Sequence, residues 1–489
     1  MAEFRDKTVV EISRALLWCG MAHPRWLLTL FALCGSVGVR ADVLSTCELP
    51  RLQEPAKCGV VQVPENPAKP DGRKLDIAVA VVPAKGGKAL PDPILLLMGG
   101  PGEESMNEAA FYVEWLEPLR RERDILLIDQ RGTGKSHRLG CDLYKDVGAA
   151  VLLRDVFPVA SAERCARELS KDADLTQYSY EHFSKDIEHI RRLLGYGPLN
   201  LFAGSYGTRA AQVFIKTHGA SVRTAMLVSV VPIDEPMPLP MAKGAQAAMD
   251  RVLEDCAAQP ACHAAFPNVR NELSQMLHRL ETEEVKVNVP GQATPVRLHR
   301  GRAAERLRSM MYRAEGAAQI PQVIHKAYLG DYQPIVEDIV SNASFIGSAI
   351  SFGLFFSIVC NEDTAFIDDA DIPAASAGTY LGDYRVRQQQ AVCSRWPKAS
   401  LPRGYRDPVR TSVPTVFVSG DTDPATPLWF TERTKQGFAQ RAEVVLVNRG
   451  HTEYLDCVAT TYQKFVAAGS VEKLDTSACK AEPRLPFNL

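Results

Sequence analysis

One serine in this chain lies in a sequence context that favours nucleophilic chemistry. Ser205 is the centre of the segment Ala203–Gly207, with the sequence AGSYG. An apolar run, Leu199–Phe202, precedes this segment, and a stretch with helical spacing follows it. A sharp turn between a strand and a helix lifts a serine hydroxyl group above the sheet, provided that small residues stand two positions before and after the serine. Because similar strings occur by chance in many loops, Ser205 needs partners before it indicates catalysis.

An acid and a base for this serine follow far downstream, each after a predicted strand. Asp423 follows the apolar run Val416–Ser419, and His451 follows the run Val444–Val447. In open sheets of parallel strands, functional residues gather at the carboxyl ends of the strands. His451 would accept the proton of the Ser205 hydroxyl group, and Asp423 would orient the imidazole and stabilise its charged form. These three residues therefore predict acyl transfer through a serine nucleophile.

The acid and the base each have an alternative interpretation. Asp421 lies two positions before Asp423 and is a second candidate for the acid. We favour Asp423 because the ring of Pro424 would restrict its loop. A histidine in a surface loop is the alternative for His451, but of the ten histidines it alone follows a late strand at the expected place.

A glycine-rich loop stands where an oxyanion would form. The segment Gly99–Gly102, with the sequence GGPG, follows the apolar run Ile94–Met98. Glycines let the backbone approach a substrate closely and turn an amide inward. We predict that the backbone N–H groups of Gly100 and Tyr206 hold the oxyanion, each lowering the barrier by roughly 3–4 kcal/mol. An ordinary Gly-Pro turn is the alternative.

The elements that must position these residues follow an α/β pattern. Buried-strand runs such as Asp124–Ile128 alternate with helical spacing such as Glu181–Leu194. Uninterrupted apolar strands that alternate with helices indicate a mostly parallel sheet with helices on both faces. Helical spacing dominates residues 236–402, and the strand pattern then returns. We therefore predict one α/β domain, in two parts (42–235 and 403–489), interrupted by a helical cap.

Residues 1–41 indicate export. The apolar segment Trp26–Cys34 follows Arg25, and Val39 and Ala41 stand three and one positions before a possible cleavage point. A basic start, a short apolar middle and a small-residue exit are typical of a secretory signal peptide. The segment is shorter than the about 20 residues that span a bilayer. A buried amphipathic helix or a lipid anchor on its last cysteine are the alternatives, and translation could start at the second methionine.

The cysteines agree with an oxidising compartment, either the periplasm or the cell exterior. Ten of them follow the predicted signal peptide, and an even number in an exported chain indicates disulfides. The sequence leaves the pairing open, but pairs of neighbours would close short loops, each stabilising by roughly 2–4 kcal/mol. Those pairs are Cys47 with Cys58, Cys141 with Cys165, Cys256 with Cys262, Cys360 with Cys393, and Cys457 with Cys479. Since none has CxxC spacing, we expect no metal site.

Charge and composition argue against several other functions. The 489 residues include 56 Lys and Arg and 58 Asp and Glu, a net charge of −2, which gives no general reason to bind nucleic acid or anionic lipid. No later segment is long and apolar enough to cross a membrane. Gly132–Ser136 resembles the end of a phosphate-binding loop, but Asp129 stands where that motif needs a glycine. We therefore expect no nucleotide or other cofactor.

Taken together, the motifs resemble one family. They are Gly99–Gly102, Asp129–Ser136, Gly204–Thr208, Asp423–Pro427 and Gly450-His451. From about Cys47 to Cys479 the chain is similar to the secreted tripeptidyl aminopeptidase and prolyl iminopeptidase family of α/β-hydrolases, including the carboxy-terminal region of the tripeptidyl aminopeptidases. The resemblance implies an α/β-hydrolase fold, a catalytic triad of Ser205, Asp423 and His451, and removal of one to three residues from free peptide amino termini.

The chain departs from the family pattern at two places. Met98 stands where prolyl iminopeptidases usually have a histidine, and Val228–Pro232 differs from the usual Asp-Gly form. An aminopeptidase must also hold the free α-ammonium group of its substrate, which a partly desolvated carboxylate would do. We predict Glu362, with Asp363 beside it, as this anchor. Solvated acids at a helix end are the other interpretation, and Glu103, Glu104, Asp234 and Glu235 are alternative anchors.

Two other functions remain open from the sequence. A carboxylesterase would use the same nucleophile and triad and would differ only in lacking the amine anchor. A non-catalytic periplasmic binding protein on a degenerate hydrolase scaffold is disfavoured by the complete triad and oxyanion loop. Halide and epoxide chemistry is disfavoured because the turn carries Ser205 rather than an aspartate.

Overall fold

The computed structural model describes residues 43–481 and 484–489. The predicted signal peptide lies outside these residues. Within them, no single helix is long and apolar enough to cross a membrane, and one bent pair, Gln333–Ala349 with Phe352–Phe366, passes by length and composition only.

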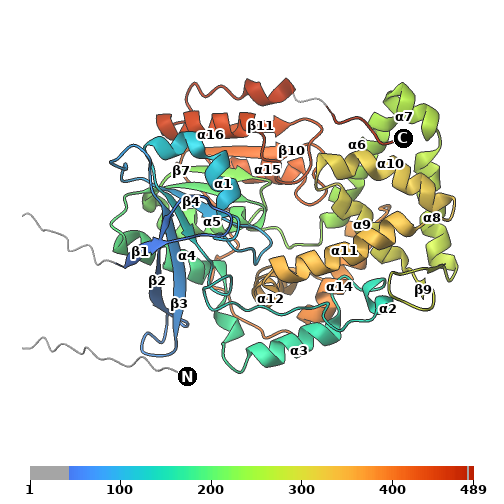
Figure 1. Ribbon diagram of the computed structural model, residues 1–489, viewed down its shortest axis with the longest axis horizontal. Coiled ribbons are helices and arrows are strands. Elements are labelled where there is room, and N and C mark those ends of the chain that lie inside the picture. Colours follow the sequence, from blue (N-terminus) through green and yellow to red (C-terminus); the bar gives the residue numbers. More distant parts are fainter. Residues whose placement is uncertain (1–42, 482–483) are drawn as a thin grey trace, which may run out of the picture. The chain divides into compact units, whose positions relative to one another are not determined.

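A nine-stranded sheet forms the centre of the described chain (Figure 1). Its strands, in spatial order, are β1 (Leu44–Cys47), β2 (Ala56–Pro64), β3 (Lys74–Val82), β5 (Ile125–Ile128), β4 (Ile94–Leu97), β6 (Leu199–Gly204), β7 (Val222–Val228), β10 (Thr415–Gly420) and β11 (Arg441–Leu446). The pairs from β5 to β11 are parallel, and β1, β2 and β3 join antiparallel at one edge. Every residue of β4, β5, β6 and β10 is buried, which explains their uninterrupted apolar sequences.

Helices cover both faces of this sheet, which confirms the predicted α/β class. Along β4, Leu95 and Leu97 join one apolar cluster, and Ile94 and Leu96 join another, because side chains alternate across a strand. The first cluster includes residues of α3 (Val159–Leu169), α4 (Tyr180–Leu193) and α5 (Tyr206–His218). The second includes residues of α1 (Ala109–Trp115) and α16 (Asp456–Ala468).

Between β7 and β10 the chain is mainly helical. The helices are α6 (Met241–Ala258), α7 (Pro260–Ala265), α8 (Val269–Thr282), α9 (Arg300–Met310), α10 (Ala314–Tyr328), α11 (Gln333–Ala349), α12 (Phe352–Ile358), α13 (Ile372–Ser376) and α14 (Tyr384–Cys393), with a short hairpin of β8 (Lys286–Val287) and β9 (Val296–Arg297). Two further helices lie outside this region, α2 (Ala149–Leu152) and α15 (Leu428–Thr434). Figure 1 shows α6, α7, α8, α9, α10, α11 and α14 gathered to the right of the sheet.

The helical region does not form one separate core. Helices α6, α8, α9 and α10 share their own apolar cluster, whereas Phe352 and Phe356 of α12 and Trp396 belong to the cluster under the sheet. The end of the helical region is therefore packed against α3 and the sheet side of the molecule. The exact domain boundaries remain a prediction.

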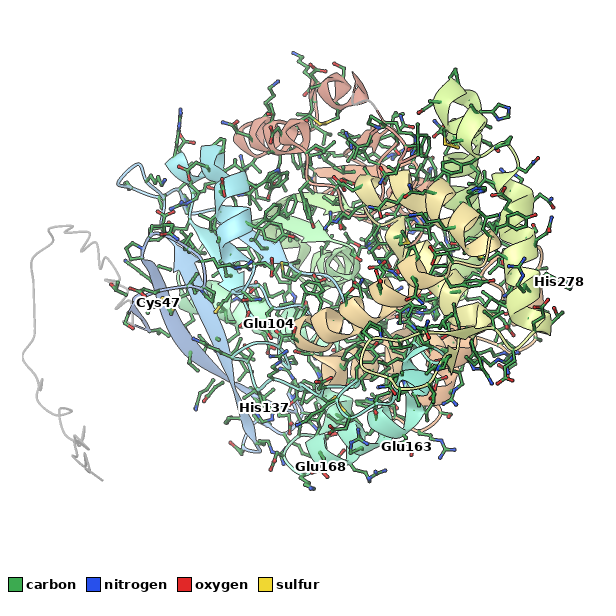
Figure 2. All side chains as sticks on the ribbon, turned by 45° about the vertical axis from the view of Figure 1, so that its right-hand side comes forward. Cys47, Glu104, His137, Glu163, Glu168 and His278 are labelled. Carbon is green, nitrogen blue, oxygen red and sulfur yellow. A yellow bond between two sulfur atoms is a disulfide. The ribbon has the colours of Figure 1, made fainter. Side chains whose placement is uncertain are left out.

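Five disulfides join the ten cysteines of the described chain, each to its neighbour in sequence. The pairs are Cys47–Cys58, Cys141–Cys165, Cys256–Cys262, Cys360–Cys393 and Cys457–Cys479. The first crosses from β1 to β2, at the position of Cys47 in Figure 2. The fourth ties α14 to the π-helical turn η4 (Val359–Asp363), which carries Glu362 and Asp363.

Candidate active site

Ser205 sits at the turn between β6 and α5. Its φ of 52° lies in the left-handed region, which a residue other than glycine adopts only when its surroundings impose it. The surroundings are crowded: a Cβ atom added at Gly207 would lie 2.1 Å from the carbonyl oxygen of Leu97. The N–H of Ser205 donates to the carbonyl of Val228 at 2.9 Å, which ties the turn to β7. A glycine two positions after the serine is therefore a steric requirement of the turn.

His451 connects Ser205 to Asp423. The imidazole Nε2 lies 2.9 Å from Ser205 Oγ, and Nδ1 lies 2.8 Å from Asp423 Oδ2. Both His451 and Asp423 are buried, with 6% and 3% of their surface exposed. An ionised carboxylate accepts the Nδ1–H and leaves Nε2 free to accept the serine proton. The structure thus brings the three predicted residues together, with the imidazole between the serine and the carboxylate, as transfer of the serine proton requires.

The local environment keeps Asp423 ionised. Burial acts to raise the pKa of this carboxyl group, but the charge and hydrogen bond of His451, with hydrogen bonds from Thr426, outweigh it and hold the pKa below its ordinary value. The backbone N–H groups of Ala425 and Thr426 each donate to Asp423 Oδ1 at 2.8 Å, and the Thr426 hydroxyl group donates to Oδ2 at 2.6 Å. The loop therefore fixes the position of the carboxylate and also helps to keep it ionised.

Asp421, the alternative acid, faces other partners. Its Oδ1 accepts the backbone N–H of Asn448 at 2.6 Å, and its Oδ2 lies 3.8 Å from an amino group of Arg251. Asp421 thus links the carboxyl end of β10 to Arg251 on α6. Asp423, and not Asp421, is the acid that contacts His451.

The glycine-rich loop lies directly beside the nucleophile. A Cβ atom added at Gly99 would lie 3.1 Å from the Cβ of Ser205. Gly100 has a φ of 101°, a conformation that favours glycine. Tyr206 is the first residue of α5, where backbone N–H groups have no partner within the helix and the helix dipole favours negative charge. The oxyanion roles of Gly100 and Tyr206 remain predictions that this position supports.

A buried aspartate braces the loop that follows. Asp129 accepts hydrogen bonds from the Ser105 hydroxyl group and the Met106 N–H, both at 3.1 Å, and from the Lys135 N–H at 3.2 Å. A Cβ atom at Gly134 would lie 2.0 Å from the same carboxylate. The segment that resembles a phosphate-binding loop is thus wrapped around Asp129.

The cap holds the loop of His451, through contacts that the sequence did not indicate. The His451 N–H donates to the carbonyl of Tyr312 at 2.8 Å, and the two rings have centroids 4.8 Å apart. Arg308 donates to the Tyr312 hydroxyl group at 2.9 Å. Glu453 Oε1 accepts the N–H of Ala314 at 2.9 Å. Tyr312 lies between α9 and α10, where helical spacing carries no sign of a distant histidine.

A second cap contact covers the oxyanion loop. The N–H of Ser351, between α11 and α12, donates to the carbonyl of Gly102 at 2.9 Å. The side chain of Ile350 lies 3.3 Å from the position of a Cβ atom on Gly100. An aliphatic side chain of the cap therefore borders the predicted oxyanion site.

Glu362 is buried and both of its carboxylate oxygens are occupied. Oε1 accepts the backbone N–H of Tyr180 at 2.9 Å, and Oε2 accepts the hydroxyl group of Tyr405. Burial raises the pKa of Glu362 to about 7. Only 1% of the residue is exposed, so the interpretation as a solvated helix-end acid is wrong. Its role as an amine anchor stays a prediction.

Asp363 forms a fully buried ion pair with Arg209 of α5. It also accepts the N–H of Met237 and the hydroxyl group of Tyr206, each at 3.2 Å. Burial raises the pKa of Asp363, while Arg209 acts in the opposite direction. The carboxylate thereby positions the side chain of Tyr206, the residue directly after the nucleophile.

The alternative anchors have different surroundings. Glu104 pairs with Arg138 at 3.2 Å, and Asp234 and Glu235 both pair with Arg433. Figure 2 labels Glu104 between the sheet and the cap. Glu103, the neighbour of Glu104, points to the predicted site, where its Oε2 accepts the N–H of Gly99 at 3.1 Å. Among the described residues, no group of three or more His, Cys, Asp or Glu side chains could hold a metal ion.

The chain belongs to the α/β-hydrolase family. The family model described as alpha/beta hydrolase fold matches residues 92–456, which confirms the predicted fold. The arrangement around Ser205 is that of a serine hydrolase of this superfamily.

Several curated relatives carry peptidase names. The chain is 28% identical over 226 residues to the serine protease Hip1 of Mycobacterium tuberculosis, covering 42% of each chain. It is 28% identical over 200 residues to the tripeptidyl aminopeptidase of Streptomyces lividans, covering 37% of this chain and 36% of the relative. The chain thus spans less than half the length of these relatives. Among solved structures, proline iminopeptidase of Mycobacterium smegmatis has 14% identity and a TM-score of 0.40 over 84% of this chain and 98% of that one.

Proposed function

We propose that this chain is an exported serine aminopeptidase, which releases one to three residues from the free amino termini of peptides. The observation that carries the proposal is the bridge of His451 between Ser205 and Asp423, with contacts of 2.9 and 2.8 Å. A serine, a histidine and a buried carboxylate in this geometry perform acyl transfer on several unrelated folds. The peptidase names of two relatives support the choice of substrate.

The mechanism has two half-reactions. Ser205 attacks the scissile carbonyl carbon while its proton passes to Nε2 of His451, and the leaving amine then takes that proton. Water, deprotonated by the same imidazole, attacks the acyl-enzyme and releases the new carboxylate together with the free serine. The N–H groups of Gly100 and Tyr206 would hold the oxyanion in both tetrahedral intermediates.

Export is supported by the five disulfides, because such bonds persist in oxidising compartments. The helical cap favours short substrates. Its residues Tyr312 and Ile350 contact the loops of His451 and of the oxyanion site, respectively, and so border the space open to a peptide.

The proposal is tested with a substrate panel on the purified protein. Peptide 4-nitroanilides with one, two or three residues, each with a free or an acetylated amino group, are compared with 4-nitrophenyl butyrate. We expect hydrolysis of free-amine peptides, labelling of Ser205 by a fluorophosphonate, and loss of both in Ser205→Ala. Hydrolysis of the ester, with no cleavage of any free-amine peptide, would identify a carboxylesterase instead. Absence of labelling and of all hydrolysis would favour a binding protein.

A further inference from the structure

Glu103 is a carboxylate on the oxyanion loop itself. It follows Gly102 by one position, is only partly buried, and turns back so that its Oε2 accepts the N–H of Gly99 at 3.1 Å. A Cβ atom on Gly99 would lie 3.4 Å from this oxygen and 3.1 Å from the Cβ of Ser205. The carboxylate and the nucleophile therefore both lie close to Gly99.

This carboxylate has no basic side chain bound to it. No ion pair of Glu103 with Lys or Arg occurs in residues 43–481 and 484–489, and its Oε1 accepts no hydrogen bond there. The other candidate anchors differ, because Glu104, Asp234, Glu235 and Asp363 are paired with arginines and Glu362 has both oxygens occupied. An unpaired carboxylate in a partly desolvated site is stabilised when it binds a cation.

Several charged side chains lie close enough to Glu103 to act on its pKa. The charges of His451 and Arg313 act to lower its pKa, Glu108 acts to raise it, and burial, the strongest influence, leaves the pKa raised. Burial raises the pKa values of Tyr112 and Tyr454, and the charge of Glu103 adds to this effect. The site thus places a carboxylate close enough to the triad to interact with its imidazole.

The position of Glu103 restricts the length of a substrate unit that it can recognise. In a peptide whose first carbonyl group reacts, the α-ammonium group belongs to the same residue as that carbonyl. In a tripeptide unit two further residues intervene, and at about 3.3–3.6 Å per extended residue the ammonium group moves about 7 Å further away. A carboxylate beside Ser205 matches the first case and not the second.

We propose that Glu103 binds the α-ammonium group of a single amino-terminal residue, so that each cleavage releases one amino acid. This inference rests on the proposed function and specifies its product. Glu362 and Asp363 would then act as internal supports of the site, and the tripeptide specificity in the name of the Streptomyces relative would not extend to this chain.

The test compares Glu103→Gln with Glu114→Gln, a matched change at an exposed acid on α1. Alanine 4-nitroanilide, its N-acetyl form and 4-nitrophenyl butyrate report the dependence on the amine, and mass spectrometry of early products from a pentapeptide reports the unit released. We expect single amino acids from the wild type. In Glu103→Gln we expect kcat/KM for the free-amine anilide to fall about 10- to 100-fold, with ester hydrolysis and fluorophosphonate labelling nearly unchanged. Glu114→Gln should retain free-amine cleavage, ester hydrolysis and fluorophosphonate labelling.

Several outcomes would overturn this inference and leave the aminopeptidase proposal standing. One is the release of intact dipeptides or tripeptides as the first products. Another is an equal loss on ester and free-amine substrates in Glu103→Gln, which indicates a structural role. A third is selective loss of free-amine cleavage in Glu362→Gln instead. If no free-amine peptide of any length is cleaved while the ester is, the proposed function itself fails.

Discussion

The carbonyl oxygen of Tyr312 accepts the backbone N–H of His451 at 2.8 Å, and the Tyr312 ring packs against the imidazole with centroids 4.8 Å apart. The base of the proposed triad is thus held from two sides, by Asp423 within the sheet domain and by a residue between cap helices α9 and α10. The cap is therefore part of the framework that orients the imidazole.

Removal of the Tyr312 ring should slow catalysis without abolishing it. Tyr312→Ala keeps the backbone carbonyl but removes the packing surface of the imidazole, so we expect kcat to fall about tenfold because His451 is oriented less well. Tyr312→Phe retains the ring and loses only the hydrogen bond from Arg308, and should retain most of the activity. Equal activities of the two variants would contradict this role.

The two neighbouring aspartates should respond differently to the same change. Asp423→Asn would favour the wrong imidazole tautomer and lower kcat by about 10⁴-fold, while leaving the fold intact. Asp421→Asn removes a charge that faces Arg251 and Asn448, and we expect activity within a few-fold of the wild type. Steady-state kinetics on the best substrate of the panel measures both. A larger loss in Asp421→Asn would assign the acid differently.

The sequence predicted the part of the site that belongs to the sheet. Ser205 and Asp423 follow strands that are buried throughout, which are visible as apolar runs, and His451 follows β11, an edge strand with only Val444 and Leu446 fully buried. Since parallel strands end at one edge of the sheet, three residues far apart in sequence could be expected to meet. The same reasoning located the glycine-rich loop after β4, because its strand is also an uninterrupted apolar run.

The sequence could not predict how the cap meets this edge. Tyr312 and Ser351 contact the site from loops between helices, and the spacing of a helix reveals its buried stripe but not what lies beyond its end. The same limit applied to Glu362, whose burial follows from the packing of η4 against Tyr180 and Tyr405. Acidic residues beside a cysteine carry no local sign of a tyrosine about 180 positions earlier in the chain.

Gly207, within α5, and Gly219, directly after it, provide a matched pair of variants that tests the geometry of the turn at Ser205. A Cβ atom at Gly207 would lie 2.1 Å from the carbonyl oxygen of Leu97, whereas one at Gly219 would meet no atom within 4 Å. Gly207→Ala should displace α5 from β4 and lower fluorophosphonate labelling of Ser205 by at least about tenfold. Gly219→Ala should retain labelling and stability. Equal labelling of the two variants would contradict the close packing at the turn.

Glu362 should make the folded state less stable as the pH rises. Burial raises its pKa to about 7, above the ordinary value of 4.5 that it regains on unfolding, so the folded state binds the proton more tightly. Its contribution to stability is fully present below about pH 4.5 and is lost as the pH rises through about 7. The shift corresponds to about 3 kcal/mol in the free energy of unfolding. Tyr405, the Tyr180 N–H and Arg209 oppose the shift, and Asp363 adds to it.

Urea-induced unfolding at pH 5 and pH 8 measures this effect. Glu362→Gln cannot ionise, so between pH 5 and pH 8 the wild type should lose up to about 3 kcal/mol of unfolding free energy relative to this variant. Glu114→Gln changes an exposed acid on α1 and should follow the pH dependence of the wild type. Parallel curves for the wild type and Glu362→Gln would mean that Glu362 stays ionised in the folded state. The carboxylate would then be held by a partner strong enough to offset its burial, such as Arg209, whose charge already acts on it.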